Sequence, residues 1–212
     1  MAKNHYLGRF ICGCALLICT ASFGQTGLNK PISSDSAIRE RVISLAKKEV
    51  GVVEKTGHND HPRIVVYHRS VSAWLANYRP AQPYCASFVN YILKAAGVVI
   101  TGVSNPARAR DWFTDKKRIV MTQQSLRGNR RMMKMPKKGS LVGYIFYSNA
   151  ISHVEILDKI DLEEGYVYCI GANTTNRSAA NSVVREGTKK DKGGVYWVKR
   201  KISMIYAIAD VI

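Results

Sequence analysis

Residues 84–91 read Tyr-Cys-Ala-Ser-Phe-Val-Asn-Tyr and open an apolar segment with helical spacing that ends near Gly97. Phe88 and Ile92 lie four residues apart, which predicts a helix that buries this face. Cys85 stands at the start of the helix. The unpaired N–H groups and the positive end of the helix dipole there favour thiolate over thiol, so the pKa of Cys85 should be low. The stretch therefore predicts a core helix and a candidate nucleophile.

The residues before this stretch also favour helices. Good N-cap residues at 34–36 precede apolar positions with helical spacing, and Gly51 ends that segment. Residues 64–74 are expected to form a second helix and 108–113 a further helical turn. Two prolines between Arg79 and Tyr84 exclude regular helix there.

The second half of the chain has the pattern of strands. Short runs rich in Val, Ile and Tyr, separated by turn-length polar links, are expected to be strands at 141–147, 151–160, 166–171, 194–198 and 202–211. Residues 116–138 are expected to form an exposed basic loop. Helices followed by strands predict an α+β fold, with N-terminal helices packed on a C-terminal antiparallel sheet.

The first residues resemble a secretory signal peptide. Lys3 and Arg9 precede an apolar run at 10–21, and Ser22-Phe23-Gly24 offers small residues at a cleavage site. A membrane anchor is the alternative, but the run is shorter than the ~20 residues of a span. A lipidated cysteine among Cys12, Cys14 and Cys19 fits poorly, because no small-residue run precedes it. We expect a signal peptide at 1–24, a polar lead-in at 25–36 and one domain at 37–212, located in the periplasm, cell envelope or extracellular space.

The formal net charge of +17 indicates a polyanionic partner. Residues 116–138 alone hold nine Lys and Arg and no Asp or Glu. A solvated basic face is the alternative for any single lysine. Nucleic acid is not the expected partner, because the basic stretch lacks interleaved aromatic residues and a signal peptide precedes the domain. We expect a monomer that binds an anionic envelope polymer.

Two strand segments carry candidate partners for Cys85. Alternation places His153 and Glu155 on one face of a strand, expected to be partly open, with Val154 packed inward. A hairpin with the next strand would bring Asn173 beside His153. An amide oxygen that accepts the imidazole N–H would leave the other nitrogen for the thiol proton, giving a Cys–His–Asn arrangement. Glu155 is not expected to replace the missing partner of His153, because it lies about 7 Å along the strand from it.

Two cysteines, Cys85 and Cys169, lie beyond the signal peptide. In an exported protein they could pair, but a disulfide would consume the nucleophile, so we expect Cys169 to be a buried strand residue. His58, Asp60, His61 and His68 are weak metal-ligand candidates, because no second ligand cluster closes a site. We expect no metal and no cofactor.

The chain resembles the CHAP family of cysteine, histidine-dependent amidohydrolases and peptidases over most of residues 37–212. This family belongs to the papain-like superfamily and is related to the NlpC-type cell-wall hydrolases. The similarity is carried, in order along the chain, by 51–60, Tyr84-Cys85-Ala86-Ser87-Phe88-Val89, Pro136-Lys137-Lys138-Gly139, Ser152-His153-Val154, Asn173-Thr174-Thr175, Arg185-Glu186-Gly187 and Gly194-Val195-Tyr196.

The resemblance implies a papain-like fold and a secreted peptidoglycan hydrolase, either an amidase or a stem-peptide endopeptidase. Cys85, His153 and Asn173 would be catalytic. The backbone N–H of Cys85, with Gln82 and Tyr84 as further candidates, would contact the oxyanion or the substrate. Gly171-Ala172-Asn173 stands where relatives often read Glu-Gly-Asn, and Gly139-Ser140 where they read Gly-Asp. The missing acid leaves open a second reading, a cell-wall-binding module with weak or no catalysis.

Overall fold

Helix α4 (Cys85–Ala95) forms the centre of the domain in this computed structural model. Phe88, Val89, Ile92 and Leu93 are completely buried, and Gly97 follows with φ of 86°, a left-handed value that favours glycine. The helix predicted from residues 84–97 is confirmed. The structure describes residues 34–127, 134–147, 149–175 and 192–212, besides Met1. The predicted signal peptide and most of the polar lead-in lie outside these residues.

Three further helices precede α4 along the chain. Helix α1 (Ser34–Lys48) begins at Ser34, so the last residues of the expected lead-in belong to it. The second helix predicted at 64–74 is two helices, α2 (Pro62–Val71) and α3 (Ala73–Asn77). The break falls at Ser72, whose extended backbone ends α2 and whose hydroxyl accepts the N–H of Leu75 to cap α3. No helix in the described parts of the chain is long and apolar enough to cross a membrane.

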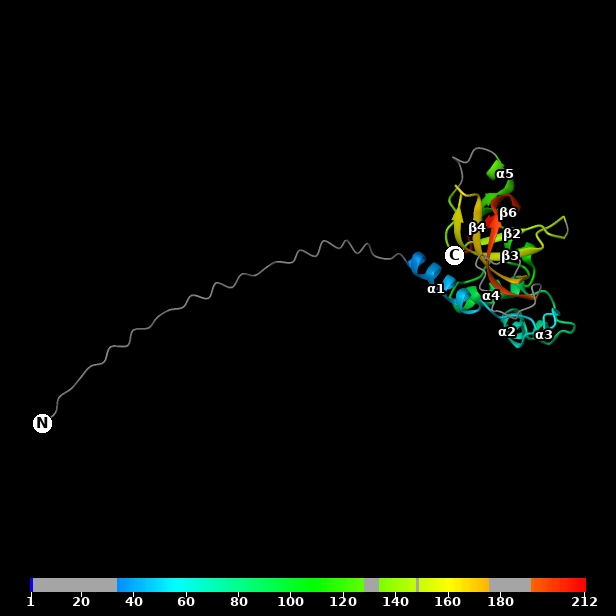
Figure 1. Cartoon of the computed structure of the whole chain (residues 1–212), viewed down its shortest axis with the longest axis horizontal. Coiled ribbons are helices and arrows are strands. Elements are labelled where there is room, and N and C mark those ends of the chain that lie inside the picture. The colour runs from blue at the N-terminus through cyan, green and yellow to red at the C-terminus, as the bar shows by residue number, and fades with distance from the viewer. Residues whose placement is uncertain (2–33, 128–133, 148, 176–191) are drawn as a thin grey trace. The chain divides into compact units, whose positions relative to one another are not determined.

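The strands form one antiparallel sheet (Figure 1). Its members are β1 (Ile119–Thr122), β2 (Leu141–Tyr144), β3 (His153–Asp161), β4 (Tyr166–Thr175), β5 (Gly193–Lys201) and β6 (Ile205–Ala209), in the order β1-β6-β2-β3-β4-β5. The short helices are η1 (Ala109–Phe113), η2 (Lys116–Arg118), α5 (Gln123–Arg127) and η5 (Ile202–Met204). The α+β class with an antiparallel sheet is confirmed.

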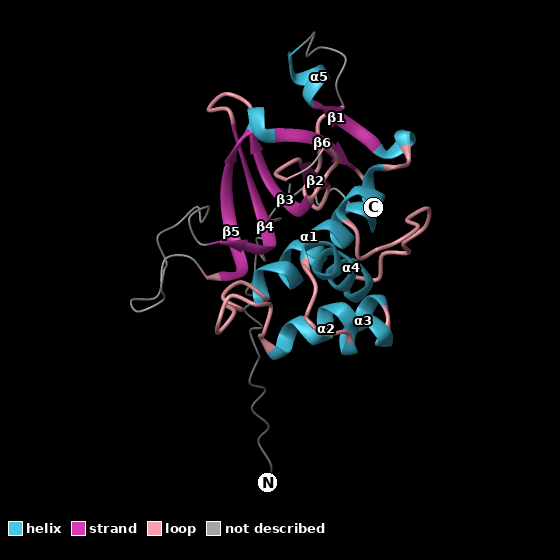
Figure 2. Cartoon of the chain, turned by 90° about the vertical axis from the view of Figure 1, so that its right-hand side faces the viewer, coloured by secondary structure: helices cyan, strands magenta, loops and turns pink. Residues whose placement is uncertain are grey.

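Both faces of the sheet are covered. Helices α1 to α4 gather beside one face (Figure 2), where Val154, Ile156 and Ile170 pack into the same core as α4. The other face holds a second core that includes Tyr144, Leu157 and other apolar side chains. The expectation that His153 faces a partly open side is therefore wrong, because His153 is 5% exposed and Glu155 is completely buried.

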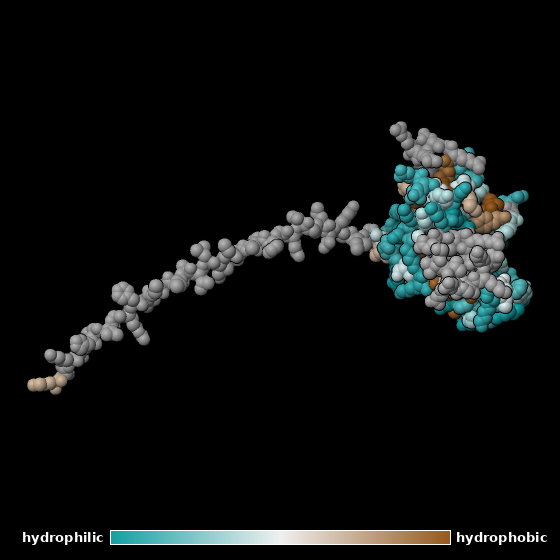
Figure 3. Space-filling view, in the orientation of Figure 1, coloured by the Kyte–Doolittle hydropathy of each residue, from teal (hydrophilic) through white to brown (hydrophobic). Residues whose placement is uncertain are grey.

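The basic stretch 116–138 is not simply a loop. Its described part contains η2, β1 and α5, and Met121 and Leu126 contribute to the second core. Because Lys and Arg are frequent throughout this stretch, its few apolar residues did not form a clear helical or strand pattern. Residues 128–133, which include Arg130 and Arg131, lie outside the described residues. Hydrophilic side chains dominate the described surface in the view of Figure 3.

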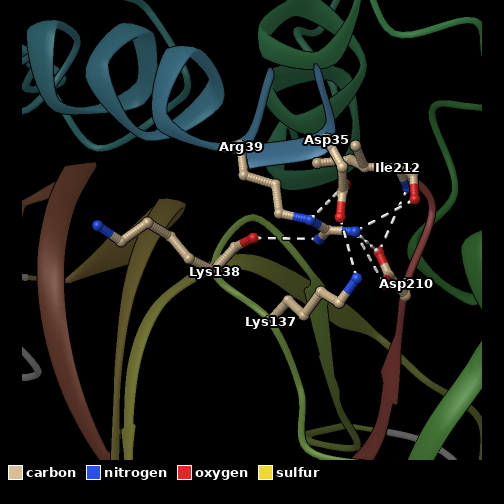
Figure 4. Close-up of polar contacts among 6 residues, drawn as sticks. All are labelled: Asp35, Arg39, Lys137, Lys138, Asp210 and Ile212. Atoms are coloured by element: carbon tan, nitrogen blue, oxygen red, sulfur yellow. Dashed lines mark hydrogen bonds and ion pairs between the residues drawn. The ribbon is translucent and has the colours of Figure 1, made fainter. Parts of the chain in front are cut away.

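A buried arginine ties α1 to the end of the chain (Figure 4). The guanidinium of Arg39 donates to both carboxylate oxygens of Asp210 at 2.9 Å and to the carbonyl of Ile212 at 3.2 Å. It also donates to Asp35 at 2.7 Å, and Lys137 reaches the other oxygen of Asp35. Because Arg39 is only 5% exposed, these carboxylates supply the counter-charge that a buried cation needs.

Candidate active site

Cys85 is the first residue of α4, directly after the N-cap residue Tyr84. Backbone N–H groups of Val154 and Ala86 donate to its sulfur, and the side chain of His153 bonds to it. Burial alone would raise the pKa of the Cys85 thiol. The hydrogen bond and charge of His153, together with the two N–H groups, outweigh burial and lower this pKa. The geometry therefore favours a thiolate at Cys85.

His153 begins β3 and is held by contacts on both ring nitrogens. Its Nε2 lies 3.1 Å from Oε1 of Glu155, which leaves Nδ1 for Cys85. The ring also stacks at a tilt on Phe146, with centroids 5.4 Å apart. Burial lowers the pKa of His153, but the bonds to Cys85 and Glu155 dominate and raise it to about 9. The bond between them lowers the pKa of Cys85 and raises that of His153, which favours the thiolate–imidazolium form of the pair.

Glu155 is the acidic partner of His153. Burial raises the pKa of its carboxyl group, but His153 and Arg200 together bring it down to about 2, so the group is charged. Arg200, on β5, donates from Nε to the two carboxylate oxygens at 3.0 and 2.9 Å. Its guanidinium also lies over the Tyr144 ring at 5.2 Å and donates to Thr174 Oγ1 at 3.0 Å. The charged guanidinium of Arg200 therefore holds the carboxylate of Glu155, which in turn orients the imidazole of His153.

Strand alternation predicts the correct face for Glu155, but the expected separation of about 7 Å from His153 argues against the contact that the structure shows. The side chains of His153 and Glu155 close the gap between alternate strand positions, because both lean along the strand. The signal that could have revealed the contact is Gly171 on the neighbouring strand. A Cβ at residue 171 would lie 2.5 Å from Oε1 of Glu155, so only glycine leaves room for this carboxylate.

Among the described residues, the side chain of Asn173 makes no hydrogen bond to His153, whose Nε2 is bonded to Glu155 instead. The register of β3 with β4 would place the two side by side, but β4 has an irregularity between Ala172 and Thr174. Asn173 adopts φ of 56° there, and its backbone approaches the Tyr84 hydroxyl. Such a bulge redirects the side chain. Glu155 takes the place predicted for Asn173 at the imidazole.

The two further candidates, Tyr84 and Gln82, are placed differently. Tyr84 is completely buried, and its hydroxyl donates to Glu54 Oε1 at 3.0 Å, so it packs in the core and offers no surface to a substrate. Gln82 is partly exposed and lines the same cleft as Cys85, while its amide nitrogen donates to the Pro80 carbonyl at 2.9 Å. A role for Gln82 as an oxyanion donor stays a prediction.

A cleft of about 570 Å³ gives access to Cys85. Aromatic side chains of the α3 region and the segment 105–110 contribute to its lining. The residues are Trp74, Leu75, Tyr78, Gln82, Pro83, Cys85, Asn105, Ala107, Arg108, Ala109, Arg110, Ile151 and Ser152. Cys85 is only 5% exposed but contributes to the lining of this cleft, so a ligand bound there lies against the residue that carries the thiol.

The loop histidines do not assemble a metal centre. Asp60 accepts the backbone N–H groups of Lys55 and Thr56, and His61 accepts the N–H of Arg63. His68 is buried between Ser87 and the Gln82 carbonyl, and this burial lowers its pKa. In the described ranges, no group of three or more His, Cys, Asp or Glu residues is placed to hold a metal ion.

Both described cysteines are free, which confirms the expectation that Cys85 and Cys169 do not pair. Cys169 is completely buried in the second core, with its sulfur 3.7 Å from the Tyr144 hydroxyl. Burial raises the pKa of this thiol well above its usual range. The pKa of Cys85 is therefore lower than that of an ordinary cysteine, and the pKa of Cys169 is higher.

No family model, curated protein or solved structure matches the chain.

Alkylation by iodoacetamide should report the thiolate–imidazolium pair directly. An ordinary thiol, with a pKa near 8.5, reacts about tenfold faster for each pH unit up to that value. The rate for Cys85 should rise less steeply with pH than that of an ordinary thiol and level off at a lower pH, because its pKa is lowered. In His153→Gln the imidazolium is lost, burial then dominates, and the rate should rise steeply with pH. A steep profile in the unchanged protein would contradict the assigned pair.

Proposed function

We propose that the chain is an exported cysteine hydrolase that cleaves an amide bond of peptidoglycan. The observation that carries the proposal is the thiol of Cys85 at a helix N-terminus, bonded to the buried imidazole of His153, which Glu155 holds from the other side. This arrangement supplies a nucleophile, a general acid–base and an orienting carboxylate. We assign the fold to the papain-like type of the CHAP family on the sequence resemblance and on this order of helix and strands.

The first half of the reaction transfers the acyl group to the enzyme. The Cys85 thiolate adds to the amide carbonyl carbon, and the backbone N–H of Cys85, which lies outside the helical hydrogen-bond ladder, is placed to donate to the oxyanion. The carbon–nitrogen bond then breaks as the imidazolium of His153 gives its proton to the leaving amine. A thioester and a neutral imidazole result.

The second half restores the enzyme with water. Neutral His153 takes a proton from a water molecule as its oxygen adds to the thioester carbonyl, and the carbon–sulfur bond breaks. A carboxylic acid leaves, and the thiolate–imidazolium pair is restored. Glu155 keeps its negative charge throughout the reaction, because the guanidinium of Arg200 balances that charge whether His153 is protonated or neutral.

The substrate class rests on the resemblance and on charge. Peptidoglycan is the substrate that the CHAP resemblance implies, and a net charge of +17 favours an anionic envelope polymer as the partner. Export rests on the apolar segment at 10–21 with Lys3 and Arg9 before it. We propose no cofactor.

The alternative is a wall-binding module with weak or no catalysis. Its main support is the glycine at 171, where relatives often have an acid. Glu155 occupies the space beside Gly171 and contacts His153, which weakens this alternative.

Mass analysis of digested cell wall tests the proposal. Purified peptidoglycan is incubated with the protein lacking residues 1–24 and, in parallel, with its Cys85→Ala variant. We expect new soluble fragments and a new amine–carboxyl pair only with the unchanged protein, and the fragment masses identify the bond. Identical digests from both proteins, with or without fragments, would reject a Cys85-dependent hydrolase.

A further inference from the structure

The cleft at Cys85 has one wall with a strong positive charge. Arg108 and Arg110 both line it, with side chains about half exposed, and no Asp or Glu is among its lining residues. Asp111 lies behind this wall, 4% exposed. Among the described residues, Asp111 is the carboxylate with which both guanidinium groups pair, at 2.9 Å from Arg108 and 3.7 Å from Arg110.

This wall is held in place before any ligand arrives. Arg108 donates to Asp111 Oδ2 at 2.9 Å, and the Ser104 hydroxyl donates to the same oxygen at 2.6 Å. The indole N–H of Trp112 donates to the carbonyl of Pro106 at 3.1 Å, and Asn105 Oδ1 accepts the N–H of Ala107 at 3.0 Å. The segment that presents the arginines is thus braced at several points, which reduces the entropy lost on binding.

Arg110 is the less committed of the two arginines. Its Nε lies 3.7 Å from Asp111 Oδ1, beyond hydrogen-bond distance, and 57% of its side chain is exposed. Asp111 already accepts from Ser104 and Arg108. A guanidinium with donors to spare, in the same cleft that Cys85 lines, is suited to a carboxylate, which it can bind through two parallel hydrogen bonds.

Trp74 and Tyr78 provide a second, apolar surface in the same cleft. Trp74 is 68% exposed and Tyr78 40%, and their ring centroids lie 4.8 Å apart. Exposed paired rings of this kind offer contact area to the aliphatic part of a ligand, at a small cost in side-chain entropy. The cleft therefore combines an apolar surface with a cationic one.

We propose that this cleft selects substrates that carry a free carboxylate beside the scissile amide, with Arg110 as the main specificity residue. The carboxylate bonds to Arg110 and Arg108, and the adjoining aliphatic segment packs on Trp74 and Tyr78. This inference rests on the proposed function, since it names the chemical group that the same site recognises. Fragments whose carboxylates are amidated are then poor ligands.

A binding measurement without turnover tests the proposal. The probes are two soluble stem-peptide fragments, identical except that one has free carboxylates and the other carboxamides. Affinities are measured by calorimetry with the Cys85→Ala protein at low and high salt. We expect the free acid to bind about tenfold or more tightly than the amide, the scale of a charge-assisted hydrogen bond, and only the acid to weaken as salt rises.

Arg110→Gln in the Cys85→Ala background should reduce the acid–amide difference to about twofold or less. Arg41→Gln, a matched change at an exposed residue of α1 outside the cleft, should leave it unchanged. Equal affinities for acid and amide, an unaltered difference in Arg110→Gln, or no binding of either fragment at millimolar concentration would each overturn the inference. An acid preference without any hydrolysis by the unchanged protein would defeat the proposed function alone, and hydrolysis without a preference would defeat this inference alone.

Discussion

Cys85→Ser should lower the rate of amide hydrolysis by at least about 10³-fold while the protein stays folded. A serine hydroxyl is not ionised by a neighbouring imidazolium, so the nucleophile is lost although the atom changes little. Burial at 5% exposure and the N–H groups of Val154 and Ala86 suit either side chain. The rate is measured by release of soluble fragments from purified peptidoglycan, and folding by thermal unfolding.

Cys169→Ser is the matched control. It changes the other described thiol, which lies in the second core beside the Tyr144 hydroxyl and outside the cleft. Its activity should stay within a few fold of the unchanged protein. Full activity in Cys85→Ser would exclude the cysteine mechanism, and loss of activity in Cys169→Ser with a normal unfolding temperature would show that the second core contributes to the chemistry.

Glu155→Gln should reduce both stability and activity, because one carboxylate serves two partners. Arg200 is 7% exposed and would lose the counter-charge that it now shares through three hydrogen bonds. Removing one partner of a buried ion pair costs about 3–5 kcal/mol. The pKa of His153, now raised to about 9 in part by Glu155, should fall. The decline of activity at alkaline pH should therefore begin at a lower pH in this variant, because the imidazolium of His153 loses its proton earlier.

A double variant separates the structural from the positioning role. Arg200→Met together with Glu155→Gln removes the buried cation along with its counter-charge and keeps an unbranched side chain over Tyr144 and Phe146. Urea unfolding should show that the double variant regains much of the lost stability. Its hydrolysis rate and its alkaline limit should remain those of Glu155→Gln. A double variant with a normal rate would show that Glu155 acts on stability alone.

The sequence was sufficient to predict the helix at Cys85 and the strands of the sheet's centre. Each has a strong periodic signal: Phe88 and Ile92 repeat at helical spacing, and Val154 and Ile156 alternate. Strand β1 was missed, because its four residues lie within a basic run and pair with β6, which is distant in sequence. A pairing of this kind has no local signature.

The candidate site was predicted in part, for a similar reason. Cys85 and His153 interact as the sequence predicts, whereas the third member depended on a backbone irregularity at Asn173. Alternation along a strand assumes regular geometry, and one residue in the left-handed region changes which way its side chain points. The contact of Glu155 with His153 has one trace in the sequence, the glycine at position 171, where a side chain would collide with the Glu155 carboxylate.

The ion pair between Arg39 and Asp210 joins the first helix of the domain to its last segment. Asp210 follows Arg39 by 171 positions, so the ribosome makes the carboxylate long after the guanidinium. Until residue 210 has emerged, docking α1 would bury a cation without that partner, which is unfavourable. Asp35, four residues away on α1, can pair with Arg39 from the start, whereas the Asp210 carboxylate joins the buried guanidinium only near the end of synthesis.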